Sequence, residues 1–178
     1  MGKTTEIMIA GFGGQGILFS GKVIAYAGLM NNKEVSWLPS YGPEMRGGTA
    51  NCHIIISDEP VGSPIIVNPD VLIVMNKPSL EKFENAVKPG GVIIIDSTLI
   101  DRKVTRDDVT VKYVDATQIA MDNNSPKLAN MVIIGAMLKA TGVMTLDEIK
   151  KGVEKSTPAS KAHLVDSNME LISAGYNG

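Results

Sequence analysis

Short apolar runs alternate with helix-spaced apolar positions along the chain, and this alternation is typical of an α/β fold. The run at 6–10 predicts a strand, and apolar or small residues at helical spacing from Ile17 to Leu29 predict a helix. Continuous apolar runs at 71–75 and 92–95 predict strands buried on both faces, as in parallel sheets. We therefore expect a three-layer α/β fold with a mainly parallel, Rossmann-like sheet.

An antiparallel hairpin is expected within this sheet. A short strand is predicted at 34–38, and β-branched content predicts another at 50–57. After a turn, residues 61–67 are expected to return beside 50–57. Pro60 and Pro64 confine this return arm to an edge or an irregular stretch, because proline cannot donate a ladder hydrogen bond.

The remaining signals are mostly helical. A helix capped by Ser79 is predicted to run to about Val87, and a strand is predicted at 110–115. Cap, proline and glycine signals predict a helix within 125–142, and a capping box opens another at 145–155. The tail at 173–178 is expected to be loosely ordered.

Composition limits the classes of function. The chain has 178 residues, 44% hydrophobic and 20% charged, which suggests one α/β domain over 1–178. A net charge of −2 argues against general nucleic-acid binding. With no apolar run near the roughly 20 residues of a membrane span and no apolar signal region, we expect a cytoplasmic protein. A lone Cys52 and two histidines, His53 and His163, predict no metal site.

The first candidate site is the glycine-rich turn Gly11-Phe12-Gly13-Gly14-Gln15-Gly16, between the first predicted strand and helix. Its Gly11-x-Gly13-x-x-Gly16 spacing matches the dinucleotide fingerprint in the required context. Glycines let the backbone approach an anion, and the helix N-terminus offers unpaired N–H groups. Gln15 adds a side-chain amide that can donate to a ligand or a partner.

The fingerprint lacks its acidic partner. A dinucleotide site needs a carboxylate at the end of the second strand, but that strand ends Trp37-Leu38-Pro39-Ser40, and Glu34 lies at its start. Three interpretations remain for the turn: a dinucleotide site, an anion site for another ligand, or a tight turn that only permits close helix packing.

The second candidate site is the loop Ser40-Tyr41-Gly42-Pro43-Glu44-Met45-Arg46-Gly47-Gly48. Glu44 and Arg46 either pair with each other or leave the guanidinium to contact a phosphate or carboxylate. Tyr41 and Met45 offer apolar contact, which favours an interface.

These two segments carry a family resemblance. Gly11 to Ile17 together with Ser40 to Gly48 resembles the gamma subunit of 2-oxoacid:ferredoxin oxidoreductases, which include the pyruvate, 2-oxoisovalerate and 2-oxoglutarate enzymes. The resemblance continues through Gly62-Ser63-Pro64, Asn76-Lys77-Pro78, Lys88-Pro89-Gly90-Gly91 and Asn130 to Gly135.

The resemblance implies a non-catalytic subunit of a complex that converts a 2-oxoacid, coenzyme A and oxidised ferredoxin to acyl-CoA, carbon dioxide and reduced ferredoxin. Alpha and beta subunits hold thiamine diphosphate and Mg²⁺. Iron–sulfur clusters of the [4Fe-4S] type lie in the beta subunit, a ferredoxin-like delta subunit, or both. The gamma subunit packs on this catalytic core and helps form the coenzyme A channel. Among substrates, overall similarity favours 2-oxoglutarate.

No residue is expected to be catalytic, since Cys52 and His53 are adjacent on a strand and face opposite sides. The residues expected to contact coenzyme A or a partner subunit are Gly11, Gly13, Gly14, Gln15, Gly16, Ser40, Tyr41, Gly42, Glu44, Arg46, Gly47 and Asn76. Two alternatives remain, a stand-alone Rossmann-type dehydrogenase and a small binding module.

Overall fold

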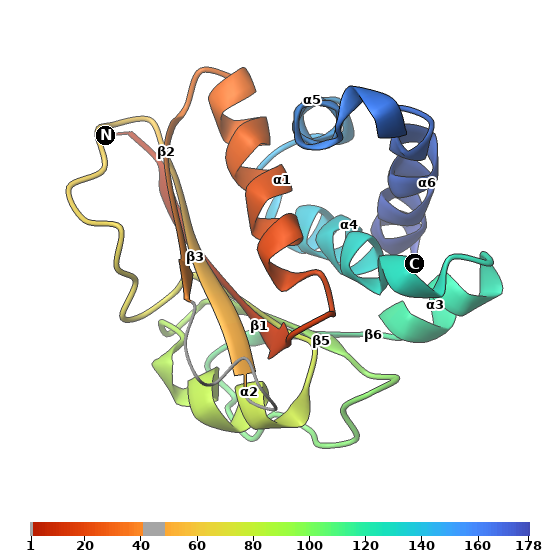
Figure 1. Ribbon diagram of the computed structural model, residues 1–178. Helices are drawn as coiled ribbons and strands as arrows, with labels where there is room; N and C mark the ends of the chain where they lie inside the picture. Colours follow the sequence, from red (N-terminus) through yellow and green to blue (C-terminus); the bar gives the residue numbers. More distant parts are fainter. Residues whose placement is uncertain (1, 41–48) are drawn as a thin grey trace.

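The computed structural model describes residues 2–40 and 49–178, which fold around a six-stranded sheet (Figure 1). The strands are β1 (Thr4–Phe12), β2 (Glu34–Ser40), β3 (Thr49–Ser57), β4 (Val71–Val74), β5 (Val92–Asp96) and β6 (Thr110–Val114). The helices are α1 (Ile17–Met30), α2 (Lys77–Phe83), α3 (Ala116–Asp122), α4 (Ala129–Thr141), α5 (Leu146–Ser156) and α6 (Leu164–Asn177). Within these ranges, no helix combines the length and apolarity that crossing a membrane requires.

The sheet is mixed, with strand order β2-β3-β1-β4-β5-β6. Strands β1, β4, β5 and β6 are parallel, whereas β3 runs antiparallel between β2 and β1. The prediction of a mainly parallel α/β sheet with an antiparallel insertion is confirmed. The buried runs of β4 and β5 lie inside the sheet, between β1 and the edge strand β6, as their continuous apolar sequence predicts.

The predicted partner of the antiparallel strand was wrong. Residues 61–67 form no strand, and β3 instead pairs with β2 on one side and β1 on the other. In one row, Leu38, His53 and Met8 lie side by side. Pro60 and Pro64 lack the N–H groups that a return strand would need, whereas β1 and β2 satisfy both edges of β3.

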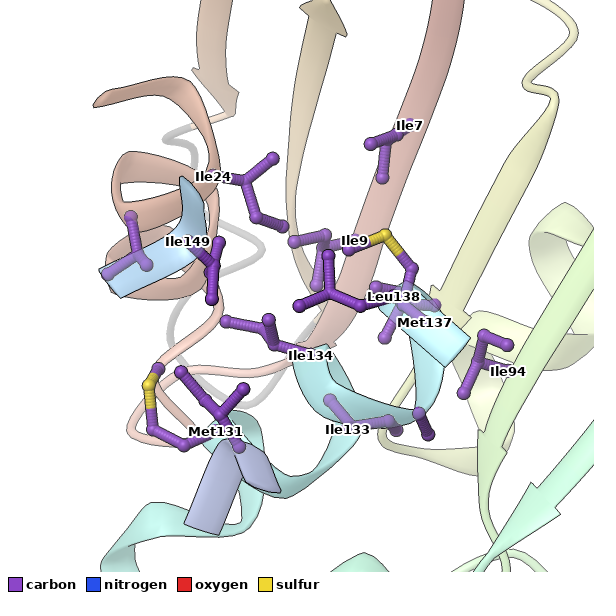
Figure 2. Close-up of a cluster of buried hydrophobic side chains, with 14 of the residues drawn as sticks. Ile7, Ile9, Ile24, Ile94, Met131, Ile133, Ile134, Met137, Leu138 and Ile149 are labelled. Carbon is purple, nitrogen blue, oxygen red and sulfur yellow. The ribbon is translucent and has the colours of Figure 1, made fainter. Parts of the chain in front are cut away.

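Each face of the sheet packs against its own core. Ile7 and Ile9 of β1 pack with α1, α4 and α5 on one face (Figure 2). Met8 points the other way and packs with Leu80 of α2. Each fully buried side chain of this size contributes about 1.5–3 kcal/mol to folding. We call the face covered by α1 the inner face and the face bearing α2 the outer face.

Two predictions were wrong, the cap of one helix and the loose order of the tail. The cap of α2 is Asn76 rather than Ser79, because the Asn76 Oδ1 accepts the Ser79 N–H at 2.8 Å. The tail is not loose, since α6 extends to Asn177 and packs against α4. The predicted capping box of α5 and the glycine stop of α4 are both confirmed.

Candidate functional site

The candidate site lies where the direction of the chain crossovers reverses. β1 leads into α1 on the inner face, whereas the adjacent parallel strand β4 leads into α2 on the outer face. The carboxyl ends of two such strands form a crevice, which is the usual ligand position in open α/β sheets. The glycine turn after Phe12 and the start of α2 at Asn76 therefore face the same crevice.

The two glycine-rich segments do not follow neighbouring strands of the sheet. Ser40 ends β2 at the same edge of the sheet as Phe12, but β3 lies between β2 and β1. In a dinucleotide fold, the strand beside β1 on this side is parallel and supplies the acidic residue at its end. Here that neighbour is antiparallel and presents its first residues, Thr49 and Ala50, at the crevice. This topology removes the position that a ribose-binding carboxylate would occupy.

The glycine turn needs glycine for two separate reasons. Gly14 has φ of 90° and Gly16 has φ of 75°, in the left-handed region where a side chain is strained. Gly16 is also the residue that caps α1, and a Cβ there would lie 2.9 Å from the Asn130 side-chain carbon. Gly13 and Gly14 are exposed, so their backbone is open to a ligand or a partner.

Gln15 joins the two sides of the crevice. Its Oε1 accepts the Phe12 N–H at 2.6 Å, and its Nε2 donates to the Met75 carbonyl at 2.9 Å. The side chain thus ties the end of β1 to the end of β4. The amide that the sequence offered to a ligand makes these two bonds within the chain, and one N–H remains for an outside acceptor.

Two buried asparagines support the crevice from behind. Asn130 of α4 is 3% exposed, and its Nδ2 donates to the Gly16 carbonyl at 3.3 Å. Asn76 is also 3% exposed and uses Oδ1 to cap α2, while its Nδ2 has no partner among the described residues. Asn76 is among the residues that the sequence predicts for the site. Asn130 is not, and it appears in the sequence prediction only as the first residue of the Asn130–Gly135 segment that carries the family resemblance.

Two hollows flank the turn. One of about 440 Å³ opens between β1 and α2 and is lined by Phe12, Gln15, Met75, Asn76, Lys77, Pro78 and Leu99. The other, about 290 Å³, lies on the α1 side and is lined by Phe12, Gly13, Gly14, Gly16, Ile17, Leu18, Phe19 and Ala50. The first hollow is lined by Lys77 and by the side-chain amides of Gln15 and Asn76.

The second glycine-rich loop is mostly beyond the described ranges. Ser40 is half-buried at the end of β2. Tyr41, Gly42, Glu44, Arg46 and Gly47 lie outside the described residues.

Cys52 and His53 face opposite sides of β3, as predicted. The Cys52 thiol is buried on the inner face, where its Sγ lies 3.6 Å from the Ile17 carbonyl. The His53 Nδ1 accepts the Ile66 N–H at 3.0 Å on the outer face. In the part of the chain that the structure describes, no three His, Cys, Asp or Glu residues gather as a metal site.

Cys52 is expected to be unreactive in the folded chain. Burial raises the pKa of its thiol to about 12, against which hydrogen bonds with Trp37 and Gly21 act only weakly. Because the thiolate is the nucleophile, a thiol reagent at mildly alkaline pH should leave the native protein unlabelled and label it fully in denaturant. Mass spectrometry measures the labelled fraction. Rapid labelling without denaturant would contradict this burial.

Gln15→Ala is expected to destabilise the fold by about 1–2 kcal/mol, because two hydrogen bonds across the crevice are lost. Urea unfolding at neutral pH measures the change. Gln118→Ala is the matched control, since Gln118 is exposed and its side chain bonds only Asp122 of the same helix. A Gln15 variant as stable as the control variant would show that the bridge contributes nothing.

The sequence matches the family described as pyruvate ferredoxin/flavodoxin oxidoreductase over residues 6–178. The ketoisovalerate oxidoreductase subunit VorA of Methanothermobacter thermautotrophicus is 41% identical over 171 residues, covering 96% of this chain and 35% of that relative. The 2-oxoglutarate synthase subunit KorC of Methanocaldococcus jannaschii is 34% identical, covering 96% of this chain and 91% of that relative.

A solved structure shares the fold. The gamma subunit of the keto/oxoacid ferredoxin oxidoreductase of Geobacter sulfurreducens PCA aligns with a TM-score of 0.85 and 29% identity. The alignment covers 98% of this chain and 95% of that subunit. This chain thus spans nearly all of two separate-chain relatives but only about a third of the VorA polypeptide.

Proposed function

The chain belongs to the pyruvate ferredoxin/flavodoxin oxidoreductase family, and we propose that it is the gamma subunit of a 2-oxoacid:ferredoxin oxidoreductase complex. The observation that carries the proposal is the match over 91% and 95% of the length of two relatives that are named as subunits of such enzymes. In this proposal the chain acts in the cytoplasm as one α/β domain.

The chemistry is proposed to take place on partner subunits. A complex of this class joins a 2-oxoacid and coenzyme A to give an acyl-CoA and carbon dioxide, and ferredoxin takes the electrons. Thiamine diphosphate with Mg²⁺ in alpha and beta subunits supplies the carbanion chemistry, and [4Fe-4S] clusters in beta or delta subunits carry the electrons. This chain contributes binding surface rather than a catalytic residue.

The glycine turn is proposed to receive part of coenzyme A. Its exposed Gly13 and Gly14 backbone lies beside the N-terminus of α1, which favours an anionic group. Asn76 and the remaining Gln15 N–H add donors on the β4 side of the crevice. Arg46 is proposed to supply the positive charge, since coenzyme A carries a diphosphate and a further phosphate.

We place 2-oxoglutarate first among the substrates of the complex. Relatives named for 2-oxoglutarate match this chain over 91% and 92% of their own length. The VorA relative, named for ketoisovalerate, has the higher identity but is a much longer chain. A branched-chain 2-oxoacid is therefore the competing substrate in the assay.

The proposal is tested with the complex purified through this subunit from its native host. Reduction of ferredoxin should require both a 2-oxoacid and coenzyme A, and comparison of 2-oxoglutarate, pyruvate and ketoisovalerate identifies the substrate. Arg46→Ala should raise KM for coenzyme A without changing assembly, and Lys127→Ala, at an exposed position, is the control. Lost co-purification in Arg46→Ala would instead indicate docking. Absence of any 2-oxoacid-dependent reduction would overturn the proposal.

A further inference from the structure

The outer face of the sheet is covered by a helix on only one half. α2 packs on β4 and β1, and α1 and the C-terminal helices lie on the inner face (Figure 1). Over β3, the outer face is crossed by the irregular connection between β3 and β4, drawn in gold in Figure 1. The β2–β3 half of the outer face is thus without a helical layer among the described residues.

Along β2 and β3, the charged side chain on this face is Glu34, at the start of β2. Inward positions of β3 belong to the inner core, so alternation assigns the neighbouring positions to the outer face. The outer positions of β2 and β3 are Glu34, Ser36, Leu38, Ser40, Thr49, Asn51, His53, Ile55 and Ser57. Burial lowers the pKa of His53, which therefore stays neutral at neutral pH. From Ser36 to the crevice the outer positions of these strands carry no charged residue type other than the neutral His53. In a chain with 20% charged residues, such depletion of charge is typical of the centre of an interface.

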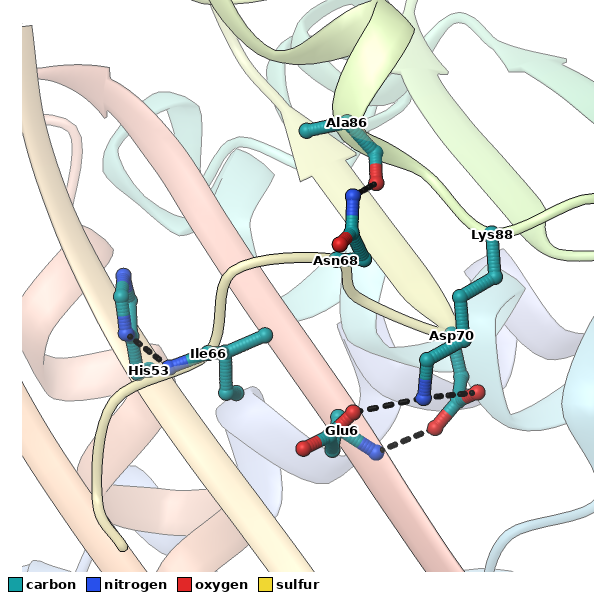
Figure 3. Close-up of polar contacts among 7 residues, drawn as sticks. All are labelled: Glu6, His53, Ile66, Asn68, Asp70, Ala86 and Lys88. Atoms are coloured by element: carbon teal, nitrogen blue, oxygen red, sulfur yellow. Dashed lines mark hydrogen bonds and ion pairs between the residues drawn. The ribbon is translucent and has the colours of Figure 1, made fainter.

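Residues 62–68, which we call the strap, are held on this face. The Ile66 N–H donates to the His53 Nδ1 at 3.0 Å, and Ile66 is 3% exposed (Figure 3). The Asn68 Nδ2 donates to the Ala86 carbonyl at 2.8 Å. Just beyond, Asp70 accepts the Glu6 N–H at 2.8 Å and pairs with Lys88. The strap is thus fixed at several points without regular pairing.

The strap directs two large apolar side chains outward. Ile65 is 61% exposed and Val67 is 74% exposed, on either side of the buried Ile66. Residues 60–69 contain no charged side chain. Leu38, 37% exposed, lies in the same row of the sheet as His53, which binds the strap. Apolar side chains held in place before binding lose little conformational freedom when a partner covers them.

We infer that the strap and Leu38 form the docking surface for the larger chain of the same oxidoreductase complex, through a complementary apolar patch on that chain. The inference rests on the proposed function. We choose the larger chain as the partner on this surface because of the VorA relative, in which the region matching this chain occupies 35% of one polypeptide. The rest of that polypeptide is covalently joined to the matching region, so in that relative a much larger unit is held at high local concentration beside this fold.

The same surface extends toward the candidate site. Phe12 lies on the same face of β1 as Met8 and is 41% exposed at the mouth of the crevice. Leu99, 48% exposed, lines the same hollow as Phe12. A chain seated on the strap would therefore reach the glycine turn, which places the two proposed roles of this subunit next to each other.

The test uses the complex assembled by co-expression of the full subunits. Val67→Asp should weaken binding of the larger chain by about tenfold or more, and Ile65→Asp with Val67→Asp should remove it. Met121→Asp is the control, because Met121 is a 53% exposed apolar residue on α3 and should leave binding unchanged. Melting temperatures of the isolated variants show that each folds. Hydrogen exchange in the unmodified complex should show added protection at residues 62–68.

The outcomes separate this inference from the function. If the unmodified subunit assembles and supports 2-oxoacid-dependent reduction, but Val67→Asp assembles equally well, the docking surface is wrong and the function stands. If the isolated chain is a dimer that Val67→Asp dissociates, with binding of the larger chain unchanged, a second copy occupies the surface and the inference is overturned. If the unmodified subunit assembles with no larger chain, the proposed function fails.

Discussion

Gly135→Ala is expected to destabilise the fold by about 3 kcal/mol or more, because α4 and α6 touch through their backbones at this position. A Cβ at Gly135 would lie 2.8 Å from both the Ile172 carbonyl carbon and the Tyr176 nitrogen. The contact is reciprocal, since a Cβ at Gly175 would lie 2.7 Å from the Val132 carbonyl carbon. The obstacle is main chain on both sides, so neither helix can yield by changing a rotamer.

Urea unfolding measures this effect, and Gly62→Ala is the control. Nothing lies within 4 Å of a Cβ at Gly62, and its φ is not in the left-handed region, so that change should stay within about 0.5 kcal/mol of the unmodified protein. A loss for Gly135→Ala as small as for Gly62→Ala would mean that α6 moves away from α4 at little cost. Gly175→Ala should repeat the large loss from the other helix.

The elements that the sequence predicted correctly are those encoded by nearby residues. The spacing from Ile17 and the capping box at Thr145 place α1 and α5, because each depends on residues within a few turns. The order of the strands is encoded differently. β3 pairs with β1 through residues about 45 positions apart, such as Met8 and His53. No pattern within a few residues of either strand indicates that the two strands pair. The same reason explains why residues 61–67 were expected to be the hairpin partner of 50–57, although their prolines correctly indicated an irregular stretch.

The tail and the candidate site show the same limit. α6 is stabilised by its contact with α4 through Gly175, and a sequence scan sees that glycine only as a helix breaker. In the site, the strand–turn–helix context identified the glycine turn directly. The partner of Gln15 is Met75, 60 positions away, so the bridge across the crevice could not be predicted from the motif.

Glu84 falls within the helix that the sequence predicts to run to about Val87, and no local pattern marks it as buried. In the structure it is 2% exposed and lies in the short turn Glu84–Ala86 after α2. Its Oε2 pairs with Arg102 at 2.6 Å, and its Oε1 accepts the Thr105 N–H at 3.0 Å. Burial opposes ionisation, but the Thr105 and Arg102 hydrogen bonds outweigh it and hold the pKa of Glu84 below its usual value. The carboxylate thereby anchors the connection between β5 and β6.

Glu84→Gln is expected to destabilise the protein by about 2–4 kcal/mol, because a partly buried Arg102 loses its counter-charge. Urea unfolding at neutral pH measures the loss. Adding Arg102→Met should recover about 1–2 kcal/mol, since the two changes act on one interaction. Asp101→Asn is the control: the Asp101–Lys77 pair is exposed and 3.7 Å long, so its loss should cost less than about 0.5 kcal/mol.

The pH dependence gives this prediction a second, independent readout. A carboxyl group whose pKa is lower in the folded state stabilises the protein above its unfolded pKa of 4.5, and that contribution is lost as pH falls through the folded value. The unmodified protein should therefore lose stability below pH 4.5 more steeply than Glu84→Gln, which has no carboxyl group to protonate there. Parallel stability curves for the two proteins below that pH would show that the charge on Glu84 does not hold the connection in place.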